Sequence, residues 1–401
     1  MMQTTTDEIR DSMASSSWIR RMFEKGLELK RLFGEDAVCD FSLGNPDVPP
    51  PAAARGALAG IADAAVKPLG LGYCPNAGVP AVREAMAKYL SRQQQAEVKA
   101  SNVVMSVGAA GAMVSFFRAV IEPGDEVVVP APYFVEYGAY CGHFGGKLKP
   151  VPSLPPSFAP DIAALRAAVG PRTRAIIVNS PNNPTGCIYS EDDLRSIAAV
   201  VDAENERRAR EGGRAMFLLS DEPYRAFAFD GAVVPPVLPL SRWCCVLGSF
   251  SKTLSLAGER VGYIAVNPSM PGGDDLVSAL ALTTRTLGYV NAPVIGQRLA
   301  AALLEETVDL EVYNRRRLKM AEVLKGAGIE FEIPKGAFYF FAKSPVDDDL
   351  KFVDALLEEK ILVVTGKGFG FPGYVRLSCC VDEKIIARSA DGFRRAMEKF
   401  R

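Results

Sequence analysis

The chain has 401 residues, of which 48% are hydrophobic and 23% charged, so it can bury a large core and still dissolve. Its 46 Lys and Arg nearly balance its 47 Asp and Glu, and the net charge of −1 provides no broad positive field for nucleic acid or an anionic membrane. No apolar run approaches the roughly 18 residues that a membrane span needs, and the acidic N-terminus does not resemble a secretion signal. We therefore expect a cytoplasmic location, with no nucleic-acid or membrane partner.

The few residues that usually build metal sites are poorly arranged for that purpose. Eight cysteines are scattered without any C-x-x-C spacing, so reduced thiols are expected rather than a zinc ribbon or a disulfide framework. The single histidine, His143, excludes a histidine-rich metal site. A Ser-His-Asp triad would depend on that one residue. We expect no bound metal.

Short apolar runs alternate with helical patterns from about residue 101 to residue 266, which is the α/β pattern. The runs are rich in Val, Ile and Leu and lack polar alternation, as expected for strands covered on both faces of a mainly parallel sheet. The expected strands are 103–107, 126–129, 175–178, 216–219, 244–247 and 261–266. Helices are expected between them, for example at 112–121 and 191–211.

The pattern changes after a long helical stretch that follows Pro293 and reaches towards Gly326 with a bend. The expected elements there are a hairpin of 330–333 and 337–342 around Pro334-Lys335-Gly336, a helix at 350–359, strands at 361–364 and 374–379, and a last helix at 383–400. They form a smaller α+β domain. The predicted organisation is an N-terminal segment (1–47) packing with the small domain, a large α/β domain (48–298) and a small C-terminal domain (299–401).

Ligands of open α/β sheets bind beyond the carboxyl ends of the strands, and four expected strands end in polar or flexible residues. Gly108-Ala109-Ala110-Gly111 opens a helix, where backbone N–H groups and the helix dipole attract an anion. The other three ends carry Asn179–Gly186, Ser220–Tyr224 and Gly248–Thr253. Taken singly, each could be an ordinary turn or cap. Together, an anion-binding turn, an amide, a carboxylate with a phenol, and a lysine indicate chemistry at one sheet edge.

Two phosphate-binding motifs are excluded. The segment before Lys252 lacks the glycines of the G-x-x-x-x-G-K-[ST] loop, because Val246 and Ser251 stand where they are needed. Gly366-Lys367-Gly368-Phe369-Gly370 lacks the strand-helix unit and acidic partner of a dinucleotide loop.

Ser249-Phe250-Ser251-Lys252, followed eight residues past the lysine by Arg260, resembles the lysine motif of the class I/II aminotransferases, which use pyridoxal 5'-phosphate (PLP). Asp221-x-x-Tyr224, Asn183-Pro184-Thr185-Gly186 and Arg376 match in order and rough spacing. The likeness runs from Gly44-Asn45-Pro46 to the last helix. It implies the α/β fold of the fold-type-I PLP-dependent transferases, with a mainly parallel central sheet in the large domain and a smaller α+β domain.

The resemblance also implies catalytic roles. Lys252 forms a Schiff base with PLP and moves the proton between the substrate Cα and the cofactor. Asp221 faces the pyridine nitrogen and keeps it protonated, so that the ring accepts electrons. Tyr224 and Asn183 hydrogen-bond the phenolic oxygen of the cofactor.

Binding roles follow in the same way. The residues expected to hold the phosphate are Arg260, Ser249, Ser251 and the turn Gly108, Ala109 and Ala110. Phe134 stands where the family places a ring stacked on the cofactor, although a core role is almost as plausible. Tyr73 matches a tyrosine that reaches the phosphate of the neighbouring subunit, which implies a homodimer with shared active sites.

Substrate contacts are expected from Arg376, which clamps the α-carboxylate with a bidentate fork, from Gly44 and from Asn183. Relatives that take dicarboxylic amino acids often carry an added basic residue, sometimes in the turn where Ala110 and Gly111 stand and sometimes supplied by the partner subunit. Nothing basic occupies that turn here, and Arg285 is a candidate for such a residue that the sequence does not place. A neutral amino acid is therefore favoured, with aspartate left open. Trp18 and Ile19 either close over the substrate or pack.

The predicted activity is transfer of an amino group from an L-amino acid to a 2-oxo acid through the PLP Schiff base on Lys252. The alternative is a PLP-dependent C–S β-lyase or a decarboxylase, since these share the fold and the core residues. A ligand-sensing module fused to a DNA-binding domain is disfavoured, because too few residues precede Gly44 and the lysine is intact.

Overall fold

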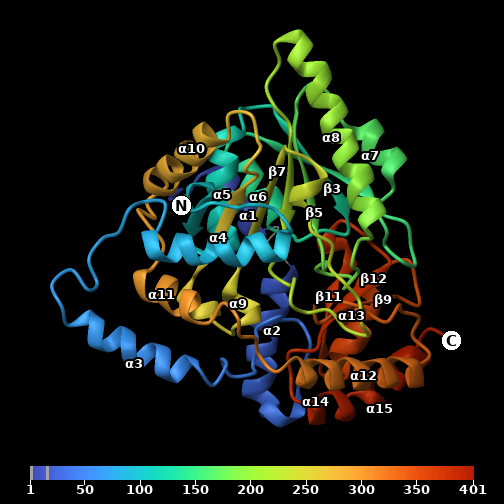
Figure 1. The fold of residues 1–401 in the computed structure, drawn as a ribbon. Coiled ribbons are helices and arrows are strands. Elements are labelled where there is room, and N and C mark those ends of the chain that lie inside the picture. Colours follow the sequence, from blue (N-terminus) through green and yellow to red (C-terminus); the bar gives the residue numbers. More distant parts are fainter. Residues whose placement is uncertain (1–2, 15–17) are drawn as a thin grey trace. The chain divides into compact units, whose positions relative to one another are not determined.

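The computed structural model of the chain describes residues 3–14 and 18–401 (Figure 1). The chain divides into two compact units, each described here by itself. The smaller unit comprises Met1–Gly44, Tyr313–Ile333 and Phe338–Arg401, and the larger comprises Asn45–Val312 and Pro334–Ala337. The domain limits expected from the sequence, at 47/48 and 298/299, stay a prediction.

A seven-stranded sheet in the order β2-β8-β7-β6-β5-β3-β4 forms the centre of the larger unit. The strands are β2 (Val103–Ser106), β3 (Glu126–Ala131), β4 (Lys147–Pro152), β5 (Thr173–Asn179), β6 (Phe217–Asp221), β7 (Cys244–Ser249) and β8 (Gly262–Val266). Only β8 runs antiparallel to its neighbours, so the other six strands end at the same edge. The mainly parallel sheet is confirmed, and the six expected strands lie within two residues of their predicted limits.

Strand β4 was not expected, because Pro150 and Pro152 make its sequence resemble a loop. A proline cannot donate a ladder hydrogen bond, so a strand with two prolines is expected at a sheet edge. β4 is such an edge, since it pairs only with β3. The backbone N–H of Lys147 donates to Asp125 and that of Ser153 to Ala131, so the odd-numbered residues face β3 and both prolines face away.

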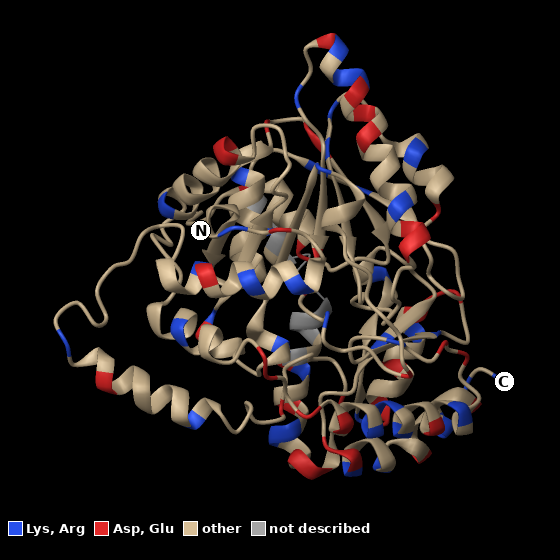
Figure 2. Cartoon of the chain, in the orientation of Figure 1, with Lys and Arg blue, Asp and Glu red and all other residues tan. Residues whose placement is uncertain are grey.

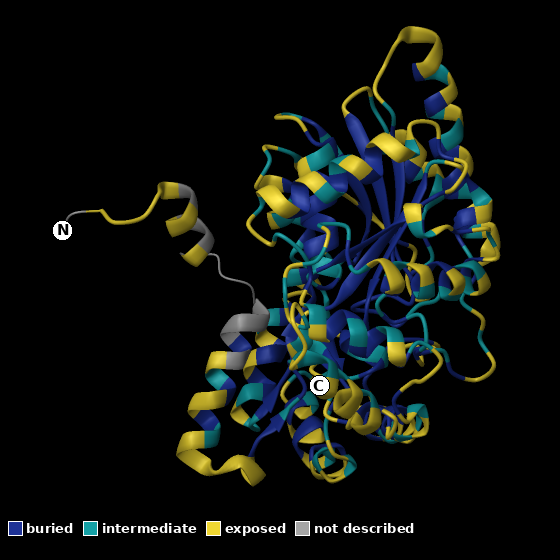
Figure 3. Ribbon diagram, turned by 60° about the vertical axis from the view of Figure 1, so that its left-hand side comes forward, coloured by how far each residue is buried: buried dark blue, intermediate teal, exposed yellow. Residues whose placement is uncertain are grey.

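Helices cover both faces of this sheet, which explains why its strands lack polar alternation. Alternate residues of β5 enter different cores: Ile176 and Val178 pack with α4 and α8, whereas Ala175 and Ile177 pack with α5, α6 and α10. The strands are accordingly the most buried part of the unit (Figure 3). The helices are α3 (Ala54–Ala65), α4 (Pro80–Gln94), α5 (Gly108–Val120), α6 (Tyr137–Gly142), α7 (Ile162–Ala168), α8 (Glu191–Glu211), α9 (Phe250–Thr253), α10 (Gly273–Thr286) and α11 (Val294–Ala302).

The two expected helices of this unit are present. α8 begins after Ser190, which forms a capping box with Asp193, and ends at Gly212 in the left-handed region (φ +70). α5 begins at Gly108, four residues before its predicted start. The early start places the turn after β2 inside the first turn of a helix.

The smaller unit contains a three-stranded antiparallel sheet, β11-β12-β9, and a parallel pair of β1 with β10. Its strands are β1 (Cys39–Asp40), β9 (Tyr339–Lys343), β10 (Ile361–Leu362), β11 (Val364–Thr365) and β12 (Tyr374–Ser378). Its helices are α1 (Asp7–Ala14), α2 (Trp18–Phe33), most of α12 (Leu310–Ala327), α13 (Asp349–Glu358), α14 (Glu383–Arg388) and α15 (Ala390–Glu398). The expected last helix is thus interrupted at Ser389, and the stretch after Pro293 forms two helices, α11 and α12.

The hairpin expected around Pro334-Lys335-Gly336 is wrong. Residues 330–333 form no strand, and β9 pairs with β12 instead. The intervening backbone is engaged in the larger unit, where Gly336 N donates to Gly186 O at 2.9 Å and Phe229 N donates to Lys335 O at 2.8 Å. The backbone N–H of Ala337, which would have closed the turn onto residue 333, donates to Phe227 O at 3.0 Å instead.

No helix among the described residues has the length and apolarity required to cross a membrane. Basic and acidic side chains are interspersed along the surface helices, as on α8 and α12 (Figure 2). All eight cysteines lie in the described part of the chain, and all are free thiols.

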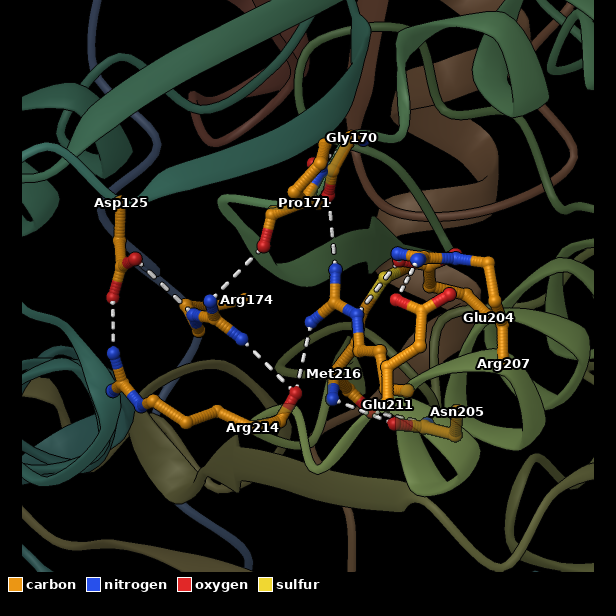
Figure 4. A network of polar contacts seen from close by, with 12 residues as sticks. Asp125, Gly170, Pro171, Arg174, Glu204, Asn205, Arg207, Glu211, Arg214 and Met216 are labelled. Atoms are coloured by element: carbon orange, nitrogen blue, oxygen red, sulfur yellow. Dashed lines mark hydrogen bonds and ion pairs between the residues drawn. The ribbon is translucent and has the colours of Figure 1, made fainter.

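An ionic network lies at the amino ends of β3, β5 and β6 (Figure 4). Asp125 is buried and contacts Arg174 Nε at 3.2 Å and Arg214 Nη1 at 2.9 Å. Burial tends to raise the pKa of Asp125, but hydrogen bonds from Glu122 N and Arg174 and the charges of the two arginines hold that pKa below its ordinary value. This network therefore fixes three strand starts at the edge opposite the polar strand ends.

Replacing the carboxylate in Asp125→Asn is expected to lower the free energy of unfolding by about 3 kcal/mol, because the buried guanidinium of Arg174 loses its counterion, whereas Arg214 keeps Glu122. Glu191→Gln is the matched control, since Glu191 pairs with Arg195 on the exposed surface of α8 and should change stability by about 0.5 kcal/mol or less. Urea unfolding at pH 7 measures both.

The pH dependence of this difference has a defined sign. Since the folded protein holds the pKa of Asp125 low, its contribution is complete above about pH 4 and is lost as the pH falls further. The gap between wild type and Asp125→Asn should therefore shrink in acid. An equal loss in both variants at pH 7 would contradict the structural role of the network.

Candidate active site

The polar strand ends meet at the carboxyl edge of the large sheet. The strand register sets Asn179 of β5 beside Asp221 of β6, and Asp221 beside Leu247 of β7. On the other side, Gly262 of β8 is paired with both Ser249 of β7 and Ser106 of β2. The turn after β2, the amide segment, the carboxylate and the lysine segment therefore share one edge, as predicted.

Asp221 is the most constrained group at this edge. Its side chain is buried, and Oδ2 accepts a hydrogen bond of 2.5 Å from the hydroxyl of Tyr137. Oδ1 is buried as well and has no hydrogen-bond partner among the described residues. Burial raises the pKa of Asp221 to about 7, against the lowering effect of the Tyr137 hydrogen bond, while the charge of Glu222 raises it further. The site thus contains a buried acceptor suited to a positively charged N–H donor.

A chain of amide hydrogen bonds fixes the neighbours of Asp221. Asn179 Nδ2 donates to the backbone oxygen of Asp221 at 2.8 Å, and its Oδ1 accepts from Asn183 N at 2.8 Å. Asn183 Nδ2 in turn lies 3.5 Å from the hydroxyl of Tyr224. All four residues are buried. Asn183 and Tyr224, predicted to act on one oxygen, are thereby held side by side.

The turn after β2 and the segment before β8 lie side by side. Gly108 adopts the left-handed region (φ +68), and a Cβ there would lie 2.9 Å from Nη2 of Arg260. Arg260 is exposed, with a φ of +50, and its Nη1 donates to the oxygen of Ala257 at 3.0 Å. A guanidinium and the first turn of α5, which begins Gly108-Ala109-Ala110, therefore lie together, as anion binding requires.

Lys252 lies in α9, a four-residue helix that continues directly from β7. Ser249 at the end of β7 and Ser251 in α9 are buried, whereas Lys252 is half-buried. Phe250 anchors the segment through its N–H, which donates to the oxygen of Val261 at 3.2 Å. The structure therefore places the lysine at the same sheet edge as Asp221.

The two predicted aromatic contacts have different surroundings. Phe134 packs edge-on against Tyr137, with ring centroids 5.5 Å apart, and is thereby connected to Asp221. Tyr73 is 91% exposed and is not brought to the other site residues by any described contact.

Within the smaller unit, Arg376 on β12 is held rigidly. Its side chain is 2% exposed, and its guanidinium lies 4.8 Å from the ring of Tyr339 and 4.9 Å from that of Phe369. Its Nη2 donates to the oxygen of Ser42. A Cβ on Gly44 would lie 1.9 Å from the hydroxyl of Tyr339, so only glycine fits there. Stacking between two rings orients the guanidinium fork.

Three further residues considered in the sequence analysis have no described contact with the site. Trp18 and Ile19 begin α2, but their side chains lie outside those that the structure describes. Arg285 is exposed on α10.

A family model for class I and II aminotransferases matches residues 36–393 of the chain. The chain belongs to this family. The aspartate/prephenate aminotransferase of Thermus thermophilus is 31% identical over 387 residues, which cover 93% of this chain and 94% of that protein. A crystal structure of an aminotransferase from Eubacterium rectale is 34% identical, covers 99% of this chain and 100% of the other, and has a TM-score of 0.92. The T. thermophilus aspartate aminotransferase with maleate is 28% identical, with a TM-score of 0.85 and 98% and 100% coverage.

These findings confirm the α/β fold-type-I prediction and the predicted activity class, so this chain is an aminotransferase. Sequence reasoning nevertheless missed residues around its site. Tyr137 and Asn179 orient Asp221 and Asn183, and Tyr339 with Phe369 encloses Arg376. Asn179 carried a signal, because it directly follows an apolar run; the two residues that enclose Arg376 did not.

Gly262→Ala tests how closely the turn after β2 and the start of β8 pack in this aminotransferase. The added Cβ would lie 2.6 Å from Gly108 C and Gly248 O, both backbone atoms that cannot rotate away. We expect a loss of about 2 kcal/mol in the free energy of unfolding, as overpacking usually costs. Gly258→Ala is the matched control, because nothing lies within 4 Å of its Cβ. Denaturant titration of both variants is the measurement, and equal stabilities would refute the packing.

Proposed function

We propose that this aminotransferase transfers the amino group of an L-amino acid to a 2-oxo acid with PLP held at the carboxyl edge of the large sheet. The observation that carries the proposal is the buried Oδ1 of Asp221, which lacks a hydrogen-bond partner among the described residues. A buried carboxylate oxygen is costly unless a donor meets it, and the protonated ring nitrogen of PLP is such a donor. When bound, PLP supplies an electron sink for the negative charge that develops at the substrate Cα.

The residues of the larger unit would divide the work as follows. Lys252 would supply the amine that attaches the cofactor, and its Nζ would take the proton from the substrate Cα and return it. Asp221 would hold a negative charge opposite the ring nitrogen. Asn183 and Tyr224, which lie 3.5 Å apart at Nδ2 and Oη, would both donate to the phenolic oxygen of the cofactor.

Binding would use the remaining predicted residues. The phosphate would be held by Arg260, by Ser249 and Ser251, and by the turn Gly108, Ala109 and Ala110. Phe134 would pack against the cofactor ring. In the smaller unit, Arg376 would bind the substrate α-carboxylate through its guanidinium fork, and the backbone at Gly44 would approach the same group.

We also propose a homodimer with shared active sites. Large apolar side chains are exposed on the loop after α3, where Val66 is 87%, Leu69 89% and Tyr73 91% exposed. Tyr73 lines a hollow of about 510 Å³ together with Tyr289 and Ile295. Several large apolar side chains exposed on one loop support an interface there. Tyr73 would then reach the phosphate site of a second copy.

Location and substrate class complete the proposal. Eight free thiols favour the reducing cytoplasm. The turn Gly108–Gly111 carries no basic residue, which favours a neutral donor, whereas relatives named aspartate aminotransferases support an acidic one. C–S β-lyase or decarboxylase chemistry is the second candidate, because the same cofactor-binding residues serve it.

Lys252→Ala is expected to abolish transamination and the visible absorption band of bound PLP while leaving the unfolding transition near that of wild type. The reason is that the half-buried lysine supplies the attaching amine. Lys88→Ala, an exposed lysine on α4, is the control and should retain both. Absorption spectra and a coupled assay for the 2-oxo acid product measure the effect, and an active Lys252→Ala protein would refute the assignment.

The donor class is read from the same band in the wild-type protein, with amino acids added one at a time. Bleaching by particular amino acids, reversed by a 2-oxo acid, would establish transamination and name the donor class. Bleaching with release of pyruvate, sulfide or carbon dioxide would instead support the second candidate.

The dimer is tested by sedimentation velocity. The wild type should give a sedimentation-derived mass of twice the 43.1 kDa of one chain. Val66→Glu should weaken association about tenfold or more, because the substitution introduces a charge into an apolar interface. Val233→Glu is the matched control, since Val233 is also exposed (77%) but lies outside the loop. A wild-type protein of single-chain mass, or equal effects of both variants, would contradict the proposal.

A further inference from the structure

Tyr137 is a buried residue that the proposed chemistry does not use directly. It begins α6 and is 1% exposed, and its hydroxyl donates to Asp221 Oδ2 over 2.5 Å. Its backbone N–H donates to Phe134 O at 3.2 Å, and the two rings meet edge-on. The phenol is therefore fixed at both ends and cannot turn away from the carboxylate.

The direction of this hydrogen bond follows from the protonation of the two groups. Burial and the adjacent carboxylate raise the pKa of Tyr137 well above its ordinary value, so the phenol keeps its proton and is the donor. The hydrogen bond lowers the pKa of Asp221 against the effect of burial. The carboxylate thus has one oxygen occupied by Tyr137 and one oxygen open.

Other charged or titratable groups face this pair, and none replaces the phenol as a donor to Asp221 among the described hydrogen bonds. Glu222 is neutralised by Arg225 at 2.9 Å and receives Gln94 Nε2 at 2.8 Å. The remaining groups are the phenols of Tyr140 on α6, of Tyr224 and of Tyr263 on β8.

We propose that Tyr137 is a positioning residue, which favours the ionised form of Asp221 by donating to Oδ2 and so reserves Oδ1 for the ring nitrogen of PLP. This inference rests on the proposed function, because it needs PLP at the site. It assigns to Tyr137 a contribution to cofactor binding made solely through Asp221. Tyr137 would therefore matter only for a ligand that carries a protonated nitrogen at that position.

The test compares two ligands on cofactor-free protein: PLP, and an analogue in which carbon replaces the ring nitrogen. Tyr137→Phe should weaken PLP binding about tenfold, the size expected for a lost hydrogen bond to a charged group. It should leave binding of the analogue within about twofold, because the analogue has no ring N–H for Asp221. Tyr189→Phe is the matched control, since Tyr189 is also buried (3%) but belongs to the core. Absorbance titration gives both dissociation constants.

Further variants exclude a folding defect and test whether Tyr137 and Asp221 act together. Tyr137→His retains an N–H donor and should recover most of the PLP affinity. Asp221→Asn should weaken PLP but not the analogue, and adding Tyr137→Phe to it should change neither constant by more than about twofold if the two residues act as one unit.

The outcomes separate this inference from the proposed function. A wild-type protein that does not bind PLP would overturn the proposed function and this inference with it. If wild type binds PLP but Tyr137→Phe weakens both ligands equally, or neither, only the positioning role is overturned. An undiminished effect of Tyr137→Phe in the Asp221→Asn background would overturn it as well.

Discussion

One buried carboxylate, that of Asp221, is the constraint on which the proposed site depends. Burial opposes the charge, and the pKa near 7 shows how closely the opposing effects are balanced. Several surrounding side chains offset the cost of burying this carboxylate. Tyr137 crosses from α6 to donate to one oxygen, while Arg225 and Gln94 offset the adjacent Glu222 so that a second negative charge is not left uncompensated. The other oxygen, Oδ1, has no hydrogen-bond partner among the described residues, so a ligand with a positively charged N–H would bind favourably there.

Strand direction decides which residues can share that edge. Six strands end there, and β8 begins there because it alone is antiparallel. Arg260, two residues before β8, therefore lies at the edge where β7 ends with Ser249. There its guanidinium lies beside Gly108, the first residue of α5. Gly262 is accommodated there because it has no side chain: a Cβ would lie 2.6 Å from Gly108 C at the start of α5 and from Gly248 O of β7. A fully parallel sheet would have sent this arginine to the opposite end.

The parts that could be predicted from sequence are those with a local signal. Apolar runs gave the six strands, and motifs such as Ser249–Lys252 marked the strand ends. Tyr137 could not be found in this way, because its partner lies 84 residues away and its surroundings resemble a core. The local sequence pattern at 330–342 is typical of a hairpin, yet none forms. Its expected turn residues, Lys335 and Gly336, are hydrogen-bonded to the backbone of Phe229 and Gly186 instead. Long-range hydrogen bonds decide such cases, and periodicity does not report them.

The prolines that hid β4 from prediction have a further consequence for the protein in a crowded solution. Since the N–H groups of Lys147 and Ser153 point towards β3, the free side of this strand is the side on which Pro150 and Pro152 stand. An eighth strand, from another molecule or a misfolded neighbour, would find acceptors there but too few donors to build a ladder. At this edge the two prolines therefore make β4 a poor template for a further strand, whereas the opposite edge strand, β2, contains no proline.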